Sequence, residues 1–248
     1  MSSASTEASA SSEASTSPGE STPAEESTST EAVSTTTTNA LPSNPRINQI
    51  CTGNPGMNDR IRTRALEMTN YRRSRLARGF VSKSNGRRLP MAADMIRLRY
   101  NCSLETSAKA AVDSCTTSYS NIPPGVQQNI YSIPKSRAQY RVDAITEAVK
   151  EWWSQVRRVD GIGMKVIYRA KHEGSPISWF TRMAWAKTTT LGCAVSLNCG
   201  SMWYAACHYY PGGNIVDDVV YMKGYPCTAC PLGYFCTTGL LCGAAADI

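Results

Sequence analysis

The chain has 248 residues, enough for one sizeable hydrophobic core with appendages. It carries 26 basic and 19 acidic side chains, and its formal net charge is +7 at pH 7. No stretch approaches the roughly 18 consecutive apolar residues of a membrane-spanning helix, so the composition argues against transmembrane anchoring.

Residues 1–45 consist mainly of Ser, Thr, Ala and Glu with a few prolines, and they contain no aromatic residue, Cys, Lys or Arg. Such a segment buries too little apolar surface to offset the entropy lost on ordering. We expect a disordered stalk. It is either O-glycosylated, as Ser/Thr-rich tracts with proline often are, or an unmodified flexible tail.

The positive charge is concentrated after this stalk. Six of the 19 acidic residues lie in residues 1–45, so the remainder carries 26 basic against 13 acidic side chains. This excess indicates either acidic partners, such as glycosaminoglycans or anionic lipids, or simply a solvated basic face. No nucleic-acid-binding motif accompanies it, and nucleic acid is not expected as a partner. The basic residues are spread out, as in Arg60, Arg62, Arg64, Arg72, Arg73, Arg75 and Arg78.

Three helices are predicted from apolar residues at helical spacing. The first covers residues 57–78 and ends before Gly79, and the second covers 104–116. The third, over 137–158, has the clearest pattern, because its apolar residues recur at four-three-four-three spacing. These residues are Ala138, Val142, Ile145, Val149, Trp152 and Val156.

The second half of the chain is richer in strand-forming residues. Residues 163–169 form one short candidate strand. Residues 191–197 and 202–210 form a predicted antiparallel pair, turned at Asn198-Cys199-Gly200. Because helices come first and strands later, the sequence predicts an α+β fold.

All ten cysteines follow residue 50, and their even number favours disulfides formed in an oxidising compartment. A zinc site at Cys227-x-x-Cys230 with Cys236 and Cys242 is the alternative. Zinc ribbons pair two such knuckles and only one is present, so disulfides are favoured. The full set is Cys51, Cys102, Cys115, Cys193, Cys199, Cys207, Cys227, Cys230, Cys236 and Cys242.

Disulfides imply an extracellular, secreted protein. The first residues lack the apolar core of a signal peptide, so we interpret the sequence as a mature form from which a signal was removed. Asn101-Cys102-Ser103 is an N-glycosylation sequon, which agrees with secretion, although its central Cys leaves occupancy open.

Several segments carry a family resemblance. Ala205–Ile215 contains C-H-Y-Y-P-G-G-N and resembles the signature C-x-Y-x-P-x-G-N, and Ser178–Trp185 reads S-W-F-T-R-M-A-W and resembles G-H-F/Y-T-Q-x-x-W. Glu67–Arg73, Met95–Cys115 and the tail Pro226–Cys242 follow further patterns of the same group. Together they resemble the CAP superfamily, in particular its nematode venom-allergen-like and activation-associated secreted proteins.

The resemblance covers roughly residues 50–248 and implies a three-layer α-β-α sandwich around a central antiparallel sheet. It divides the chain into the stalk (1–45), a CAP domain (46–223) and a Cys-rich C-terminal extension (224–248). It also implies a disulfide between Cys193 and Cys207. The connectivity of the other cysteines stays open, since spacing cannot decide it.

The family's central cavity normally carries two His and two Glu, which can hold a divalent metal. The positions of this sequence that match them are Tyr119, Gln128, Gln155 and Trp179. Neutral amides and a Trp are poor metal ligands, so the resemblance implies no metal site and no cofactor here.

Only two histidines remain in the chain. His172 lies in a polar stretch and is interpreted as a solvated loop residue, and His208 follows a strand Cys and is interpreted as structural. The sequence has no G-x-S-x-G elbow, phosphate-binding loop or dinucleotide fingerprint. We therefore expect a protein that is not an enzyme.

Two functional hypotheses follow. The first is binding or transport of a sterol or other lipid, which the family resemblance attributes to an aromatic loop just before the signature that Ser178–Trp185 resembles. The matching residues are Tyr168, Ile177, Trp179 and Phe180, although the family's aromatic spacing is not intact and these side chains could equally belong to the core. The alternative is an extracellular module that binds a host immune or matrix protein or an acidic glycan. The ligand, the host partner and the oligomeric state are not encoded in any motif.

Overall fold

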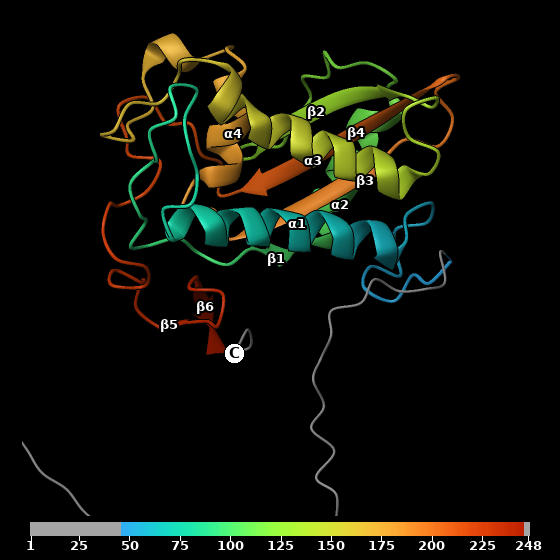
Figure 1. Cartoon of the computed structure of the whole chain (residues 1–248). Helices are drawn as coiled ribbons and strands as arrows, with labels where there is room; N and C mark the ends of the chain where they lie inside the picture. Colours follow the sequence, from blue (N-terminus) through green and yellow to red (C-terminus); the bar gives the residue numbers. More distant parts are fainter. Residues whose placement is uncertain (1–45, 246–248) are drawn as a thin grey trace, which may run out of the picture. The chain divides into compact units, whose positions relative to one another are not determined.

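The computed structural model describes residues 46–245, which belong to one compact unit (Figure 1). The stalk predicted over residues 1–45 lies outside the described residues. Among the described residues, no helix is long and apolar enough to cross a membrane.

The three predicted helices are present with shifted ends. Helix α1 spans Asp59–Ala77, beginning where the Asn58 side chain accepts the N–H of Ile61 and ending before Gly79, whose φ is +73°. Helix α2 spans Cys102–Asp113 and is capped by the Asn101 side chain.

Helix α3 spans Arg141–Arg158 and therefore begins four residues later than predicted. Its start is fixed by the Asp143 carboxylate, which accepts the backbone N–H of Tyr140 at 3.0 Å. Its apolar stripe faces the interior, and Trp152 is fully buried. A short helix, α4 (Ile177–Ala184), follows the 3₁₀ turn η1 (Ala170–His172).

The main sheet has the order β1-β3-β4-β2. Strands β3 (Thr190–Val195) and β4 (Met202–Tyr210) are the predicted antiparallel pair, and β2 (Gln127–Pro134) pairs antiparallel with β4 along its whole length. The two-residue β1 (Arg99–Tyr100) adds a short parallel edge to β3.

Helices cover both faces of this sheet, which gives the predicted three layers. Helix α2 packs against β3 and β4 on one face, while α1, α3 and α4 pack together on the other (Figure 1). The close approach of α2 depends on Gly192 in β3, because a Cβ there would lie 2.2 Å from the backbone nitrogen of Glu105.

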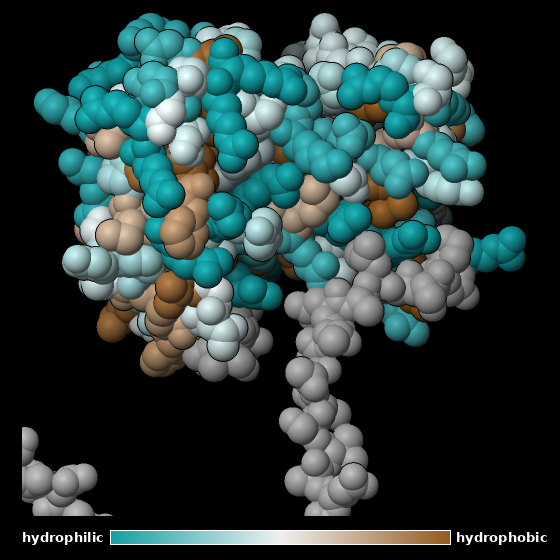
Figure 2. Space-filling model, viewed as in Figure 1, coloured by the Kyte–Doolittle hydropathy of each residue, from teal (hydrophilic) through white to brown (hydrophobic). Residues whose placement is uncertain are grey.

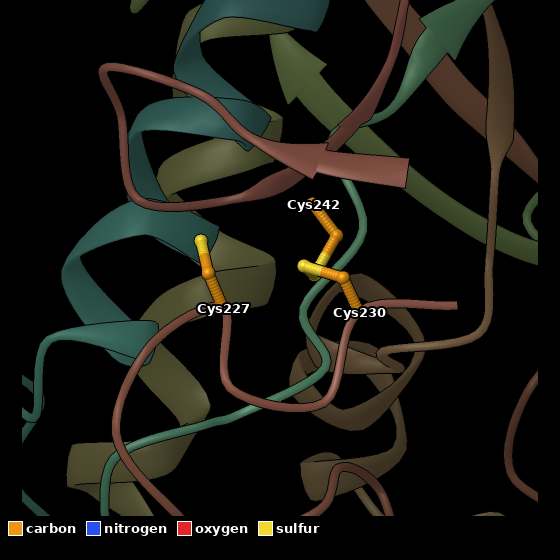
Figure 3. Close-up of side chains that lie close together, drawn as sticks. All are labelled: Cys227, Cys230 and Cys242. Atoms are coloured by element: carbon orange, nitrogen blue, oxygen red, sulfur yellow. A yellow bond between two sulfur atoms is a disulfide. The ribbon is translucent and has the colours of Figure 1, made fainter. Parts of the chain in front are cut away.

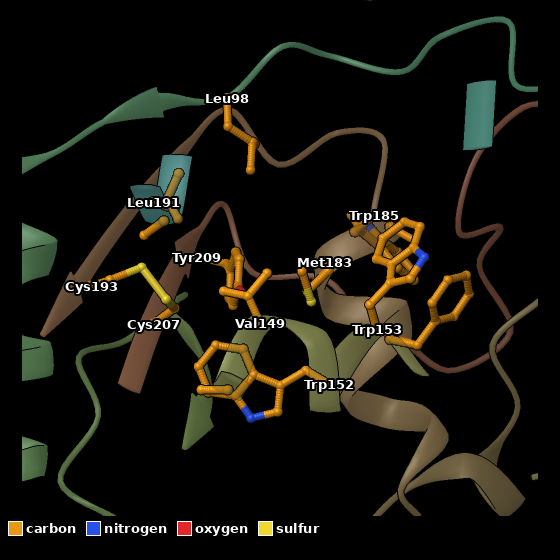
Figure 4. Close-up of a cluster of buried hydrophobic side chains, with 14 of the residues drawn as sticks. Leu98, Val149, Trp152, Trp153, Met183, Trp185, Leu191, Cys193, Cys207 and Tyr209 are labelled. Carbon is orange, nitrogen blue, oxygen red and sulfur yellow. A yellow bond between two sulfur atoms is a disulfide. The ribbon is translucent and has the colours of Figure 1, made fainter. Parts of the chain in front are cut away.

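The core fills the space between the sheet and the α1–α3–α4 layer. Figure 4 shows three tryptophans of this core, Trp152, Trp153 and Trp185, near the Cys193–Cys207 disulfide. The two cysteines face each other across the antiparallel β3–β4 pair, as the family resemblance implied.

The strand predicted over residues 163–169 was wrong. Val166 has a φ of +52°, which interrupts an extended run, and only one isolated bridge forms there, between Ile167 and Val219. The segment instead exchanges irregular backbone hydrogen bonds with residues 217–220.

The C-terminal segment is cross-linked by disulfides and hydrogen-bonded to the rest of the fold. Strands β5 (Tyr234–Cys236) and β6 (Cys242–Ala244) form a small hairpin, held by the pairs Cys227–Cys236 and Cys230–Cys242. Backbone hydrogen bonds join Cys242 to Met95 and Arg97. The sulfurs of Cys227, Cys230 and Cys242 lie within 4.8 Å of one another (Figure 3), but oxidised sulfurs are not the thiolates that zinc requires.

The two remaining disulfides hold α2 at both ends. Cys51–Cys102 fixes its first residue to the segment before α1, and Cys115–Cys199 joins the chain just after it to the β3–β4 turn. No free cysteine occurs among the described residues, 46–245.

Candidate functional site

Gln128 lies in a hydrogen-bonded network between the sheet and α2. Its Nε2 donates to the carbonyl oxygen of Tyr119 at 3.2 Å, and its Oε1 lies 2.8 Å from Nε2 of His208 on the neighbouring strand. Nδ1 of His208 lies 2.7 Å from Oγ of Ser107 on α2. Two of the positions that match the family tetrad, Tyr119 and Gln128, are thus joined here through one hydrogen bond.

The network fixes the tautomer of His208. Because the Gln128 nitrogen is bonded to the Tyr119 carbonyl, the Gln128 oxygen faces the ring and accepts the proton of Nε2. Nδ1 is then the acceptor for the Ser107 hydroxyl. The ring is fully buried, and burial lowers the pKa of His208 to about 4, so the imidazole is neutral at pH 7.

A hydroxyl facing an imidazole resembles part of a hydrolase site, but its chemistry is weak here. A depressed pKa makes His208 a poor base at neutral pH, and the neutral Gln128 amide cannot stabilise an imidazolium as a carboxylate does. The network is better described as a clamp that joins α2, β4 and β2. The sequence interpretation of His208 as structural agrees with this geometry.

Trp179 lies on the opposite face of the sheet. It belongs to α4, it is half-buried, and its ring stacks edge-on against Tyr131 of β2 with centroids 6.1 Å apart. The Asn129 amide donates to the Trp179 carbonyl at 2.9 Å. Residues 129 and 131 alternate with Gln128 along β2, so Trp179 and Gln128 lie on opposite faces of that strand.

Gln155, the fourth position, is buried on α3 and bonds within its own helix. Its Nε2 donates to a Glu151 carboxylate oxygen at 3.0 Å, and that carboxylate also accepts from Arg158 at 2.5 Å. Among residues 46–245, no hydrogen bond joins Gln155 to the other three positions. The four side chains offer no imidazole and no carboxylate, so they do not fit a divalent metal of the kind the family can hold.

Most of the residues that sequence analysis assigned to a lipid site are part of the core. Tyr168, Ile177 and Phe180 are each at most 2% exposed. The Tyr168 hydroxyl is hydrogen-bonded to Ser178, and the Phe180 ring packs edge-on against Trp153 with centroids 4.8 Å apart. Only Trp179 of the four reaches the surface.

His172 was predicted to be solvated, and this was wrong. It is 4% exposed, because η1 folds the polar stretch back so that the ring packs beside Tyr168. Nδ1 accepts the backbone N–H of Arg169 at 2.9 Å, and Nε2 has no hydrogen-bond partner. Burial, aided by the charge of Lys171, lowers the pKa of His172, although the Gly161 carbonyl acts in the opposite direction.

Two of the arginines expected on a solvated face are fully buried, Arg62 and Arg73. Arg62 forms ion pairs with Asp59 at 2.7 Å and Glu105 at 2.6 Å, which joins α1 to α2. Arg73 donates to backbone carbonyls that include those of Ile96 and Trp185. Burial lowers the pKa of Arg73 to about 9, so it stays charged at pH 7. Sequence spacing alone cannot separate such residues from exposed ones.

Comparisons with known proteins place these observations in a family. The model of the cysteine-rich secretory protein family, CAP, matches residues 66–209. The Ancylostoma secreted protein of Ancylostoma caninum is 34% identical over 82% of this chain and 49% of its own length. A CRISP/Allergen/PR-1 protein of Trittame loki is 31% identical over 72% of this chain and 44% of its own length. The chain thus spans about half the length of these two relatives.

Solved structures agree with the fold. The crystal structure of Na-ASP-1 aligns with a TM-score of 0.74 and 33% identity, over 81% of this chain and 51% of that one. BmVAL-1 aligns with a TM-score of 0.71 and 30% identity, over 76% of this chain and 97% of its own. NaASP2, solved with Zn²⁺, aligns with a TM-score of 0.70 and 30% identity, over 76% and 98%.

Proposed function

Because the chain belongs to the CAP family of cysteine-rich secretory proteins, we propose that it acts by binding and not by catalysis. The observation that carries this proposal is the chemistry of the four positions that match the family's tetrad, two of which, Gln128 and Trp179, lie on opposite faces of β2 here. Tyr119, Gln128, Gln155 and Trp179 supply no general base and no charged metal ligand. The neutral, buried His208 does not replace them.

The site of action is extracellular. Five disulfides close all ten cysteines, and the relatives include secreted proteins. Disulfides of this kind persist outside the reducing cytosol.

We propose a sterol or a related lipid as the first ligand class. Its support is the half-buried Trp179–Tyr131 pair on the α4 side of β2, an aromatic surface on which a rigid apolar ligand could lie. Burial of Tyr168, Ile177 and Phe180 confines this contact to the aromatic pair.

Saturable binding of labelled cholesterol by the purified, oxidised protein tests this proposal. We expect Trp179→Ala to weaken binding about tenfold, since it removes a large aromatic contact. The matched control is Tyr71→Ala, an aromatic on α1 that is 58% exposed and should not affect affinity. Circular dichroism checks the fold of both variants. Absence of saturable binding, or equal loss in both variants, would exclude sterol at this site.

The alternative is an extracellular module that binds a host immune or matrix protein, or an acidic glycan. The salt dependence of the affinity distinguishes this function from lipid binding, because ionic contacts weaken as ionic strength rises and apolar contacts do not. The cholesterol assay is therefore repeated at low and high salt.

A further inference from the structure

Three arginines surround one exposed phenylalanine at the end of α1. The guanidinium carbons of Arg75, Arg78 and Arg88 lie 5.4, 5.8 and 6.0 Å from the centre of the Phe80 ring, which is 43% exposed. No ion pair joins any of the three to a carboxylate of the described residues. The ring offsets part of the repulsion among three like charges, and an anion would offset more.

A hairpin that follows α1 carries further basic side chains. A backbone bridge pairs Ser82 with Arg88, and the N–H of Lys83 donates to Arg87 at 2.9 Å. Gly86, with a φ of +77°, closes the turn. The hairpin is thus an ordered element that carries Lys83, Arg87 and Arg88.

Lys83 faces the segment around η1 across a hollow of about 400 Å³. Lys165, Arg169 and Lys171 line the same hollow, and Asp160 is its only acidic lining residue. In Figure 1 the cyan-green hairpin lies beside the gold segment that contains η1, and Figure 2 shows hydrophilic side chains over this upper left part of the molecule.

His172 adds a second kind of observation to this hollow, which it helps to line. Because Nδ1 accepts the Arg169 N–H, Nε2 carries the proton of the neutral ring and is a hydrogen-bond donor. This donor is buried and makes no hydrogen bond of normal geometry among the described residues, although the Gly161 backbone lies near enough to raise the pKa of the ring. Buried donors are normally satisfied, so a donor with only a weak backbone contact, beside several cations, suits an anionic ligand or a bridging water.

The charge continues into a second hollow of about 380 Å³, which shares Lys165 with the first. Lys187 and Lys223 line it with Asp94. Of the acids nearby, Asp218 pairs with Lys187 at 3.3 Å, and Asp94 accepts the N–H of Met222 at 2.9 Å. Lys165 and Lys223 have no ion-pair partner among the described residues.

We propose that the Phe80 arginine cluster, the hairpin and the two hollows form one groove that binds a sulfated polysaccharide. Lys83, Lys165, Lys171 and Lys223 are among its unpaired cations, and a linear polymer with repeated charges can reach several of them at once. This inference rests on the extracellular binding role proposed above, but not on its sterol ligand.

The structure favours a glycan over a membrane or a nucleic acid. The cations line hollows, whereas a flat anionic bilayer attracts a protruding basic surface. Three guanidinium groups lie 5.4 to 6.0 Å from the centre of the Phe80 ring and compete with a base for its face, so the ring is a poor platform for stacking. Sulfate groups stay charged at every physiological pH and occur on extracellular polymers.

Binding of fluorescent heparin to the oxidised protein tests the proposal. The groove variant is Lys83→Gln/Lys165→Gln/Lys171→Gln. The matched control is Lys109→Gln/Lys135→Gln/Lys150→Gln, which removes the same charge from lysines that line neither hollow. We expect the dissociation constant at 150 mM salt to rise at least about tenfold for the groove variant, and less than about threefold for the control.

Three outcomes would overturn the proposal. Equal loss in the two variants would mean that net charge alone attracts heparin, and no loss in either would place the site elsewhere. Binding of desulfated heparin, phosphatidylserine vesicles or DNA as tightly as heparin would exclude a sulfated glycan as the specific partner. Cholesterol binding by the same variants separates the two proposals. The groove variant should keep it, and Trp179→Ala should keep heparin binding.

Discussion

Replacing His208 by Gln removes a buried group whose protonation opposes folding. The pKa of His208 is about 4 in the folded protein, against 6.5 for an unperturbed histidine. The unfolded state therefore binds a proton at a higher pH than the folded state does. Stability contributed by the neutral ring is present above pH 6.5 and is lost as the pH falls toward 4.

The size of the effect follows from the difference in pKa. At 1.36 kcal/mol per pKa unit, the full contribution is about 3 kcal/mol, and about 2 kcal/mol of it is lost between pH 7 and pH 5. His208→Gln cannot titrate, yet its amide can still donate to Gln128 and accept from Ser107. We therefore expect wild type to lose about 2 kcal/mol of stability relative to this variant between pH 7 and pH 5.

Urea unfolding with the disulfides intact, at pH 7, 6, 5 and 4.5, measures this difference. Carboxylates and His172 titrate in both proteins, so the difference between the two pH profiles isolates His208. If the free energies of unfolding of the two proteins run parallel across this range, the ring is not desolvated as described and the reasoning fails.

Two further changes test the ion pair and the sequon. Glu105→Gln leaves the buried Arg62 paired with Asp59 alone, and we expect the free energy of unfolding, measured in urea at pH 7, to fall by about 3 kcal/mol or more. As the control, Lys109→Gln breaks an exposed ion pair and should lower it by less than about 1 kcal/mol. Glycosylation of Asn101 is expected in secretory expression, with a mass shift removed by an N-glycosidase and absent from Ser103→Ala. An unglycosylated product, despite glycans on a control protein, would show that the cap or the disulfide at Cys102 forms first.

Periodicity located the helices because a 3.6-residue stripe depends only on neighbours along the chain. It placed Trp152 of α3 in the core, but it put the start of that helix too early, because the Asp143 cap acts through a single hydrogen bond. The strand expected at 163–169 does not form because the backbone of Val166 is left-handed, and strand propensity does not predict this conformation.

The site was less predictable than the fold. Gln128 and His208, 80 positions apart, meet through the register of β2 and β4, and Ser107 joins them because α2 packs on the sheet. His172 was misassigned since polar neighbours mask a side chain that tertiary packing buries. The burial of Arg62 could not be predicted from the sequence either, because its charge is balanced by Glu105, which is distant along the chain.

The disulfide at the C-terminal end of α2 has a consequence for how the protein withstands proteolysis. The exposed chain between Cys115 and β2 is an accessible place to cut, and a single cleavage there would not release either piece. The Cys115–Cys199 bond would hold the fragments together, since it joins chain on both sides of the cut. A nicked molecule would migrate as one species until reduced and as two afterwards, while its sheet, clamp and basic groove stayed assembled.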